Sequence, residues 1–133
     1  MIDIENEVIS IVHDVLEANG INASLESVLN LTPPTFPTVC VEEISNSSYD
    51  FSADSKTVEN HAEVGYEINI FTNSLNGKKS EGKEILKVID DKLISIGFTR
   101  ISKTQLALDE GTKFRLIARY SATVGRNDII YGR

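Results

Sequence analysis

Two stretches of the chain repeat apolar residues at the spacing of an amphipathic helix. The first stretch, residues 2–19, ends at the helix stop Asn19–Gly20, and its apolar stripe consists of Ile4, Val8, Ile11, Val12, Val15 and Leu16. The second stretch, residues 78–96, is closed by Gly97, and its stripe consists of Ile85, Leu86, Ile89, Leu93 and Ile96. Each pattern predicts a helix that buries one face.

Two other stretches, residues 62–72 and 113–124, alternate between apolar and polar residues, which is typical of half-buried strands. Further strands are expected at 38–44 and 99–107, and the loop at 109–111 is suited to a hairpin before the last strand. The order αββαββ predicts an α+β fold, in which a mostly antiparallel sheet carries both helices on one face. We expect a single domain, residues 1–133, because no linker or internal repeat divides the chain.

Three segments lack a clear period. Residues 21–36 contain at most a short extended piece before Pro33–Pro34 and Pro37 break any helix. Residues 45–60 are polar and are predicted to form a long loop or an extended hairpin arm. Residues 125–133 form a C-terminal extension beyond the last strand.

Acidic and basic residues are divided unevenly along the chain. Residues 1–75 contain 13 Asp and Glu but one basic residue, Lys56, whereas residues 76–133 contain 7 Asp and Glu and 12 Lys and Arg. Such asymmetry concerns interaction surfaces rather than the fold. Either an acidic face of one copy docks against a basic face of another, or the two parts interleave in one domain and their charges cancel locally.

The sequence contains no recognisable arrangement for catalysis, for a metal or for a cofactor. There is no Gly-rich phosphate loop, Cys/His cluster or nucleophile elbow, and His13 and His61 lack neighbours at ligand spacing. Asp90 and Asp91 point about 100° apart on a helix, so we expect them to be solvated rather than to act as a pair. Cys40, the lone cysteine, is expected to be a small buried hydrophobe. We therefore expect no enzyme.

Composition also argues against two classes of partner. The formal net charge of −7 disfavours sequence-independent binding to DNA, which needs a concentrated cationic surface. No apolar run approaches the length of a membrane span, and the acidic N-terminus is unlike a signal peptide. A lone cysteine fits a reducing compartment.

Assembly surfaces are the better hypothesis. The polar faces of strands 62–72 and 113–124 carry acidic and basic residues respectively, which either pair within one sheet or set the register between subunits. The C-terminal extension either folds back on its own core or adds to a neighbour. The candidate interface residues are Glu63, Glu67, Arg115, Arg119, Arg126, Ile129, Ile130, Tyr131, Tyr49 and Phe51.

The order of these segments resembles the tail terminator (tail completion) proteins of long-tailed bacteriophages and prophages. The likeness covers most of the chain, and order and spacing carry it rather than a single motif. In the first half of the chain it consists of a short N-terminal amphipathic helix, a proline-led strand (FPTVCVEE) and a polar excursion with an aromatic residue (SSYDFS). These are followed by a strand ending in an aromatic residue (EVGYEINIFTN), a helix ending in GF (GKKSEGKEILKVIDDKLISIGF) and a closing hairpin (FRLIARYSATV).

The resemblance implies a structural protein without catalytic residues, which forms a homohexameric ring. Such a ring stacks on the last ring of the tail tube, ends tube polymerisation and presents a surface to the head–tail connector. DNA passes through its lumen without specific binding. The protein then belongs to the tail and neck of the virion, after assembly in the host bacterial cytoplasm. Two alternatives stay open: another phage neck or head–tail connector protein, and a small non-enzymatic adaptor domain.

Overall fold

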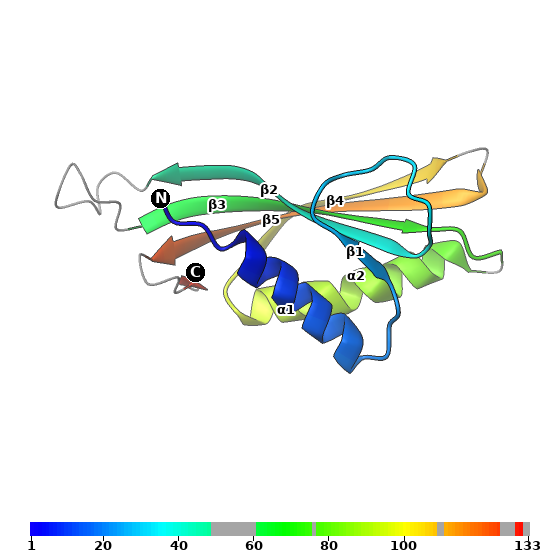
Figure 1. The fold of residues 1–133 in the computed structure, drawn as a ribbon, viewed down its shortest axis with the longest axis horizontal. Coiled ribbons are helices and arrows are strands. Elements are labelled where there is room, and N and C mark those ends of the chain that lie inside the picture. The colour runs from blue at the N-terminus through cyan, green and yellow to red at the C-terminus, as the bar shows by residue number, and fades with distance from the viewer. Residues whose placement is uncertain (49–60, 76, 109–110, 126–129, 132–133) are drawn as a thin grey trace.

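The computed structural model describes residues 1–48, 61–75, 77–108, 111–125 and 130–131. Its elements, in chain order, are α1 (Glu5–Ala18), β1 (Ser24–Glu26), β2 (Thr38–Ser48), β3 (His61–Thr72), α2 (Lys78–Ser95), β4 (Thr99–Leu108), β5 (Lys113–Gly125) and β6 (Ile130–Tyr131). Both helices lie on the same side of a single sheet (Figure 1). The predicted α+β fold is therefore confirmed.

The strands form a mixed sheet in the order β1-β2-β3-β5-β4, and β6 also pairs with β5. Only β1 and β2 run parallel, and the other neighbours are antiparallel. Because β5 lies between β3 and β4, strands from the early and late parts of the chain meet at the middle of the sheet. Early strands therefore occupy one side of the sheet, and β4 and β5 occupy the other.

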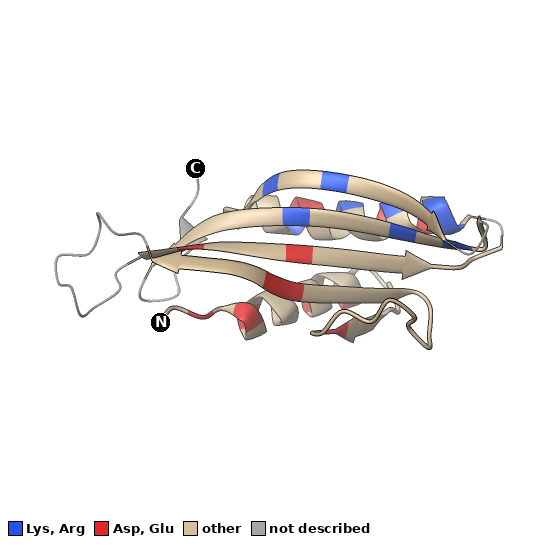
Figure 2. Ribbon diagram, turned by 90° about the horizontal axis from the view of Figure 1, so that it is seen from above, with Lys and Arg blue, Asp and Glu red and all other residues tan. Residues whose placement is uncertain are grey.

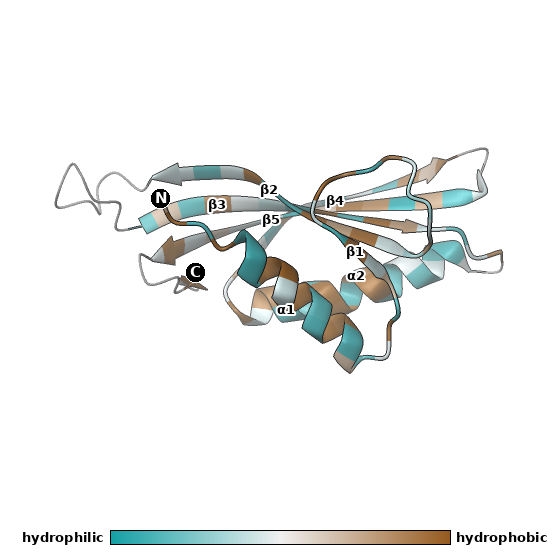
Figure 3. Ribbon diagram, viewed as in Figure 1, coloured by the Kyte–Doolittle hydropathy of each residue, from teal (hydrophilic) through white to brown (hydrophobic). Residues whose placement is uncertain are grey.

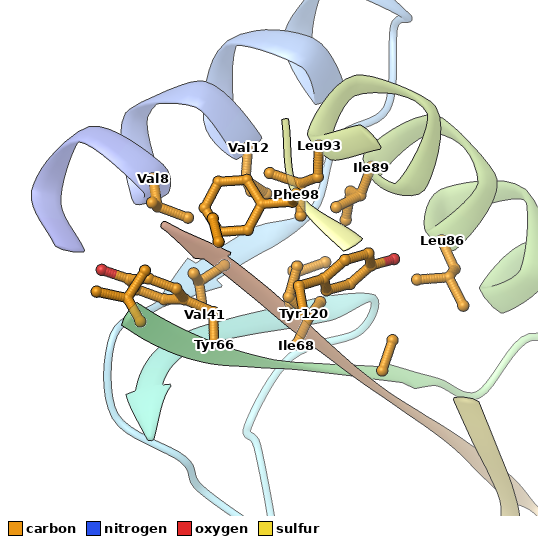
Figure 4. Packing of buried hydrophobic residues seen from close by; sticks show 14 of the residues in the cluster. Val8, Val12, Val41, Tyr66, Ile68, Leu86, Ile89, Leu93, Phe98 and Tyr120 are labelled. Atoms are coloured by element: carbon orange, nitrogen blue, oxygen red, sulfur yellow. The ribbon is translucent and has the colours of Figure 1, made fainter. Parts of the chain in front are cut away.

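The core fills the space between the helices and the inner face of the sheet. The predicted stripes point into it, since α1 buries Val8, Val12 and Leu16 and α2 buries Ile85, Leu86, Ile89 and Leu93. Apolar positions accordingly face the sheet on both helices (Figure 3). Phe98 lies among these helical side chains and above the sheet (Figure 4). Its ring meets the Tyr66 ring edge to face, with the centroids 6.0 Å apart.

Helix α2 approaches β5 closely at Gly82. A Cβ atom at this position would lie 3.2 Å from the Phe114 ring and 3.4 Å from Leu116. A glycine inside a helix is destabilising by roughly 1 kcal/mol relative to alanine. The lack of a side chain at Gly82 is what allows the helix to lie so near the sheet.

The outer face of the sheet, away from the helices, is partly covered by the segment that joins β1 to β2 (Figure 1). Phe36 of this segment has the Lys113 ammonium 5.6 Å from the centre of its ring. Phe71 of β3 is buried on this face, and the Arg115 guanidinium lies 5.5 Å from its ring centre. The outer face is therefore less polar near Phe71 than an exposed sheet face would be.

The structure departs from the sequence predictions chiefly at the ends of strands. The strand predicted at 38–44 continues to Ser48, so of the two forms predicted for residues 45–60, residues 45–48 take that of an extended hairpin arm, paired with β3. Residues 49–60 of the predicted arm lie outside the described residues. The short strands β1 and β6 were not predicted as strands, because segments of three and two residues show no period.

Candidate assembly surfaces

Two tyrosines lie opposite each other at the centre of the inner face. Tyr66 of β3 and Tyr120 of β5 are cross-strand partners, and both are buried. Tyr66 donates its hydroxyl to Glu43 of β2 at 3.1 Å, and Tyr120 donates to Asp90 of α2 at 2.7 Å. Burial and then the adjacent carboxylates raise the pKa of both phenols, so both remain protonated donors.

Asp90 is anchored by these contacts, and the prediction that it is solvated was wrong. Its Oδ2 atom lies 2.9 Å from Nη1 of Arg100 in β4, and its side chain is only 13% exposed. Asp91, in contrast, is exposed and pairs with Lys87 of the same helix. The helical spacing separates the two carboxylates as expected, but it gives no sign that Tyr120 and Arg100 face one of them. One carboxylate of α2 thus holds both β5 and β4.

The predicted interface residues Glu67 and Arg119 contact each other within the subunit. They are cross-strand partners on the outer face, with Nε of Arg119 2.9 Å from Oε2 of Glu67. Asn69, which is buried, donates to Oε1 of Glu67 at 2.9 Å and accepts hydrogen bonds from Nε and Nη2 of Arg115. Of the two arrangements that the sequence allows for these charges, the structure contains pairing inside one sheet.

The contacts with Asn69, Arg115 and Arg119 also determine the ionisation of Glu67. Burial alone would raise the pKa of this carboxyl group. Hydrogen bonds from Asn69 and Arg119, together with the charges of Arg119 and Arg115, outweigh burial and lower the pKa. Glu67 is therefore an anion at neutral pH, although its side chain is only 12% exposed.

Away from this central pair, the two signs of charge separate to opposite sides of the sheet (Figure 2). The elements α1, β1, β2 and β3 contain nine Asp and Glu and no Lys or Arg. Strands β4 and β5 contain five Lys and Arg and no Asp or Glu, and α2 carries both signs. The uneven charge along the sequence is thus a charge difference across the width of the sheet.

We call the side formed by α1, β1 and β2 the acidic edge. Here β1 pairs with Thr38–Cys40 of β2. Beyond β1, the Glu5 carboxylate accepts a hydrogen bond from the backbone N–H of Glu43 at 2.9 Å, and the Asn46 side chain donates to the Ile2 carbonyl at 2.7 Å. A short strand and the Glu5 carboxylate therefore occupy backbone positions of β2 that would otherwise be open, and the Asn46 side chain ties the Ile2 carbonyl to this edge.

We call the opposite side, formed by β4 and the first turn of α2, the basic edge. Strand β4 has ten residues and pairs with β5 along one side, and no strand within the described residues pairs with its other side. All its residues from Arg100 to Ala107 are exposed. The short strand β6 pairs with the same side of β5, at Thr123 and Val124, which lie beyond the residues that β4 contacts. An unpaired strand of this length is a template for contact with another chain.

Each edge also carries a groove of the corresponding charge. The groove at the acidic edge lies between α1 and β1, has a volume of about 510 Å³, and includes Asp14 and Glu26 in its lining. The groove at the basic edge lies between the start of α2 and the β4–β5 hairpin, has a volume of about 410 Å³, and includes Lys78, Lys79 and Lys113. The two grooves are complementary in charge.

An isoleucine is exposed at a β-bulge in β4 and at another in the part of β2 that β1 does not contact. Ile44 follows Glu43 in β2, Ile101 follows Arg100 in β4, and neither isoleucine has a partner in the strand register. Ile44 is 47% exposed and Ile101 is 62% exposed. The two bulges flank the row of cross-strand partners that contains the central tyrosines, with Ile44 on the side of Gly65 and Ile101 on the opposite side, toward Arg119. Neither bulge is marked by the pattern of apolar and polar residues.

The structure places the other predicted interface residues apart from these edges or outside its described range. Glu63 is exposed on β3, opposite Thr123. Ile130 packs against the core, and the β6 backbone pairs with β5, so this piece of the C-terminal extension lies on its own subunit. The residues outside the described range are Arg126, Ile129, Tyr49 and Phe51.

The described residues offer no arrangement that resembles a catalytic or metal site. No group of three or more His, Cys, Asp or Glu side chains among them could hold a metal ion. Burial, followed by the charges of Glu42, Glu26 and Glu67, raises the pKa of the Cys40 thiol to about 11, so this buried thiol is protonated at neutral pH and unreactive. In the part of the chain that is described, no helix is both long enough and apolar enough to cross a membrane.

The fold is similar to that of a chain in the virion of a native gene transfer agent (GTA) particle. The likeness covers 89% of this chain and 91% of that chain, with a TM-score of 0.62 and 14% sequence identity. At this identity the similarity is one of fold. No protein-family model matches the chain, and no curated protein sequence matches it.

Proposed function

We propose that this protein is a structural component of a phage-like virion and acts there as a tail terminator. The observation that carries the proposal is the similarity of fold, over nearly the whole length of both chains, to a chain of a gene transfer agent virion. The resemblance in the order of sequence segments adds the specific role. A subunit without a catalytic cluster in its described residues, but with two unlike edges, suits assembly better than chemistry.

In this proposal the copies form a homo-oligomeric ring of six subunits. One face of the ring matches the growing end of the tail tube, and the other face offers no equivalent end. Polymerisation of the tube therefore stops, and the free face receives the head–tail connector. DNA passes through the lumen without specific binding, because acidic side chains lining it repel phosphate.

Mixing the purified protein with the tail tube protein of the same genome tests the role. We expect the protein to bind one end of each tube and to shorten the tubes, as measured by electron microscopy at increasing ratios of the two proteins. Light scattering should show a ring-sized species. A stable monomer at every concentration, including in the presence of the tube protein, contradicts the proposal. Binding to the connector without binding to tubes would favour another neck protein.

A further inference from the structure

We propose that copies of this chain associate side by side, with the basic edge of one copy against the acidic edge of the next. This inference rests on the proposed ring, because it names the surfaces through which the ring closes. It is argued from the opposite charges of the two edges, the open strand β4 and the two exposed isoleucines.

Charge selects contact between unlike edges. The basic edge presents Lys79 beside its groove and Lys103 on the open strand, whereas the acidic edge presents Asp14 and Glu26. Two basic edges placed together would bring like charges close, which opposes association, and the same holds for two acidic edges. Contact between a basic and an acidic edge is complementary. Such a contact leaves an unused edge at each end, so it repeats until a ring closes.

The exposed isoleucines provide an apolar centre for this contact. Ile101 of the basic edge and Ile44 of the acidic edge flank the row of central tyrosines on opposite sides. A shift of about one residue along the strands therefore brings them together when two copies pack edge to edge. An apolar centre within a charged rim is the usual anatomy of a protein interface. Because Glu5 already binds the backbone N–H of Glu43 and the Asn46 side chain holds the Ile2 carbonyl beside β2, we infer that side chains of the acidic edge make this contact.

Two double charge reversals test the pairing in the full chain. The first combines Lys79→Glu with Lys103→Glu, and the second combines Asp14→Lys with Glu26→Lys. We expect each variant alone to raise the Kd of self-association at least about tenfold at low salt, measured by light scattering and sedimentation. An equimolar mixture of the two variants should recover association, because each reversed basic edge then meets a reversed acidic edge and the native edges meet each other.

Matched controls reverse the same number of charges on exposed positions of α2. Lys87→Glu with Lys92→Glu matches the basic-edge variant, and Glu84→Lys with Asp91→Lys matches the acidic-edge variant. We expect both controls to associate within about threefold of the wild-type chain, since long-range effects of net charge are screened by salt. Thermal unfolding of all four variants establishes that each is folded.

Equal association of edge variants and controls would overturn this inference, as would a mixture that does not recover. A wild-type chain that stays monomeric, both alone and with tail tube protein, would overturn it too. The proposed function fails by a separate result. If the chain forms rings through these edges but the rings bind no tail tube, the edge pairing stands and the tail-terminator role is wrong.

Discussion

The two edges of the sheet protect their backbone groups in different ways. At the acidic edge, the short strand β1 and the Glu5 carboxylate occupy backbone positions along β2, and the Asn46 amide donates to the Ile2 carbonyl beside it. At the basic edge, no strand among the described residues pairs with the outer side of β4, which contains the charged residues Arg100 and Lys103. Charged residues on an edge strand discourage pairing with an identical strand. Backbone contacts therefore cover part of one edge, whereas charged side chains are the protection of the other.

Both edges are nevertheless tied to the central tyrosines, with unequal strength. Asp90 receives the Tyr120 hydroxyl at 2.7 Å and pairs with Arg100 at 2.9 Å. Glu43 receives the Tyr66 hydroxyl at 3.1 Å and the Asn46 amide at 3.3 Å. Thus β4, which has no described strand on its outer side, is the strand whose anchoring carboxylate, Asp90, makes the shorter contacts. We infer that Asp90 compensates for the missing neighbour of β4.

Among substitutions that test this difference between the edges, Asp90→Ala is expected to have the largest effect on stability. It should lower the free energy of unfolding by about 3 kcal/mol, because the buried Tyr120 hydroxyl and the Arg100 guanidinium both lose their partner. Glu43→Ala should lower it by about 1–2 kcal/mol, because its contacts are longer. Urea unfolding monitored by circular dichroism measures both. A larger effect for Glu43 would show that the acidic edge carries the stronger anchor.

Glu5→Ala should uncover part of the acidic edge. The backbone N–H of Glu43 loses its acceptor, so we expect a loss of about 1–2 kcal/mol and faster hydrogen exchange at that amide. Glu7→Ala is the matched control, because Glu7 lies in the same first turn of α1 but is exposed. If exchange at Glu43 is equally fast in both variants, the carboxylate of Glu5 does not cover this edge.

The centre of the sheet, where the acidic and basic sides meet, should respond to pH. Because the pKa of Glu67 is lowered in the folded state, its ionised form stabilises the fold above the unfolded pKa of about 4.3. This stabilisation is lost as the pH falls through the folded pKa. Glu67→Gln should therefore lower the free energy of unfolding by about 1 kcal/mol at pH 7, and the difference from wild type should vanish in acid. A difference independent of pH would mean that packing of Glu67, rather than its charge, stabilises the sheet.

The smallest effects on monomer stability are expected at the two bulges. Ile101→Ser and Ile44→Ser should each change the free energy of unfolding by less than about 0.5 kcal/mol, because both side chains are exposed. Val41→Ser in the core of β2 is the contrasting variant and should be strongly destabilising. Urea unfolding at low protein concentration separates these effects from association. A large loss at Ile101 would mean that it packs within its own subunit.

Side-chain periodicity predicted the parts of this fold that bury one face. Alternation marked β3 and β5, and the helical stripes marked α1 and α2, because in each of them burial is what distinguishes one face from the other. Residues 45–48 gave no such sign, since their strand is held by backbone pairing with β3 and their side chains are mostly exposed. Polarity alone therefore could not decide between a loop and an extended hairpin arm for these residues.

The candidate surfaces were less predictable, because they depend on the order of strands. The sequence marked Glu67 and Arg119 as charged positions, but only the insertion of β5 between β3 and β4 makes them partners. The same insertion assigns the acidic and basic parts of the chain to opposite edges. The exposure of Asp90 was wrongly predicted for a related reason. The apolar pattern of α2 does not tell where β4 and β5 lie, so it could not show that Arg100 and Tyr120 contact this carboxylate.

The strand order gives each subunit an electric dipole that runs across the sheet, from the acidic side to the basic side. Copies that meet edge to edge would align these dipoles head to tail along the circumference of the ring. In an open arc they add to a net moment, but in a closed ring they cancel by symmetry. The field far from a completed ring would then have no component from these dipoles and would depend on the net charge and the two faces, so a partner that approaches along the axis would meet the same potential at every subunit.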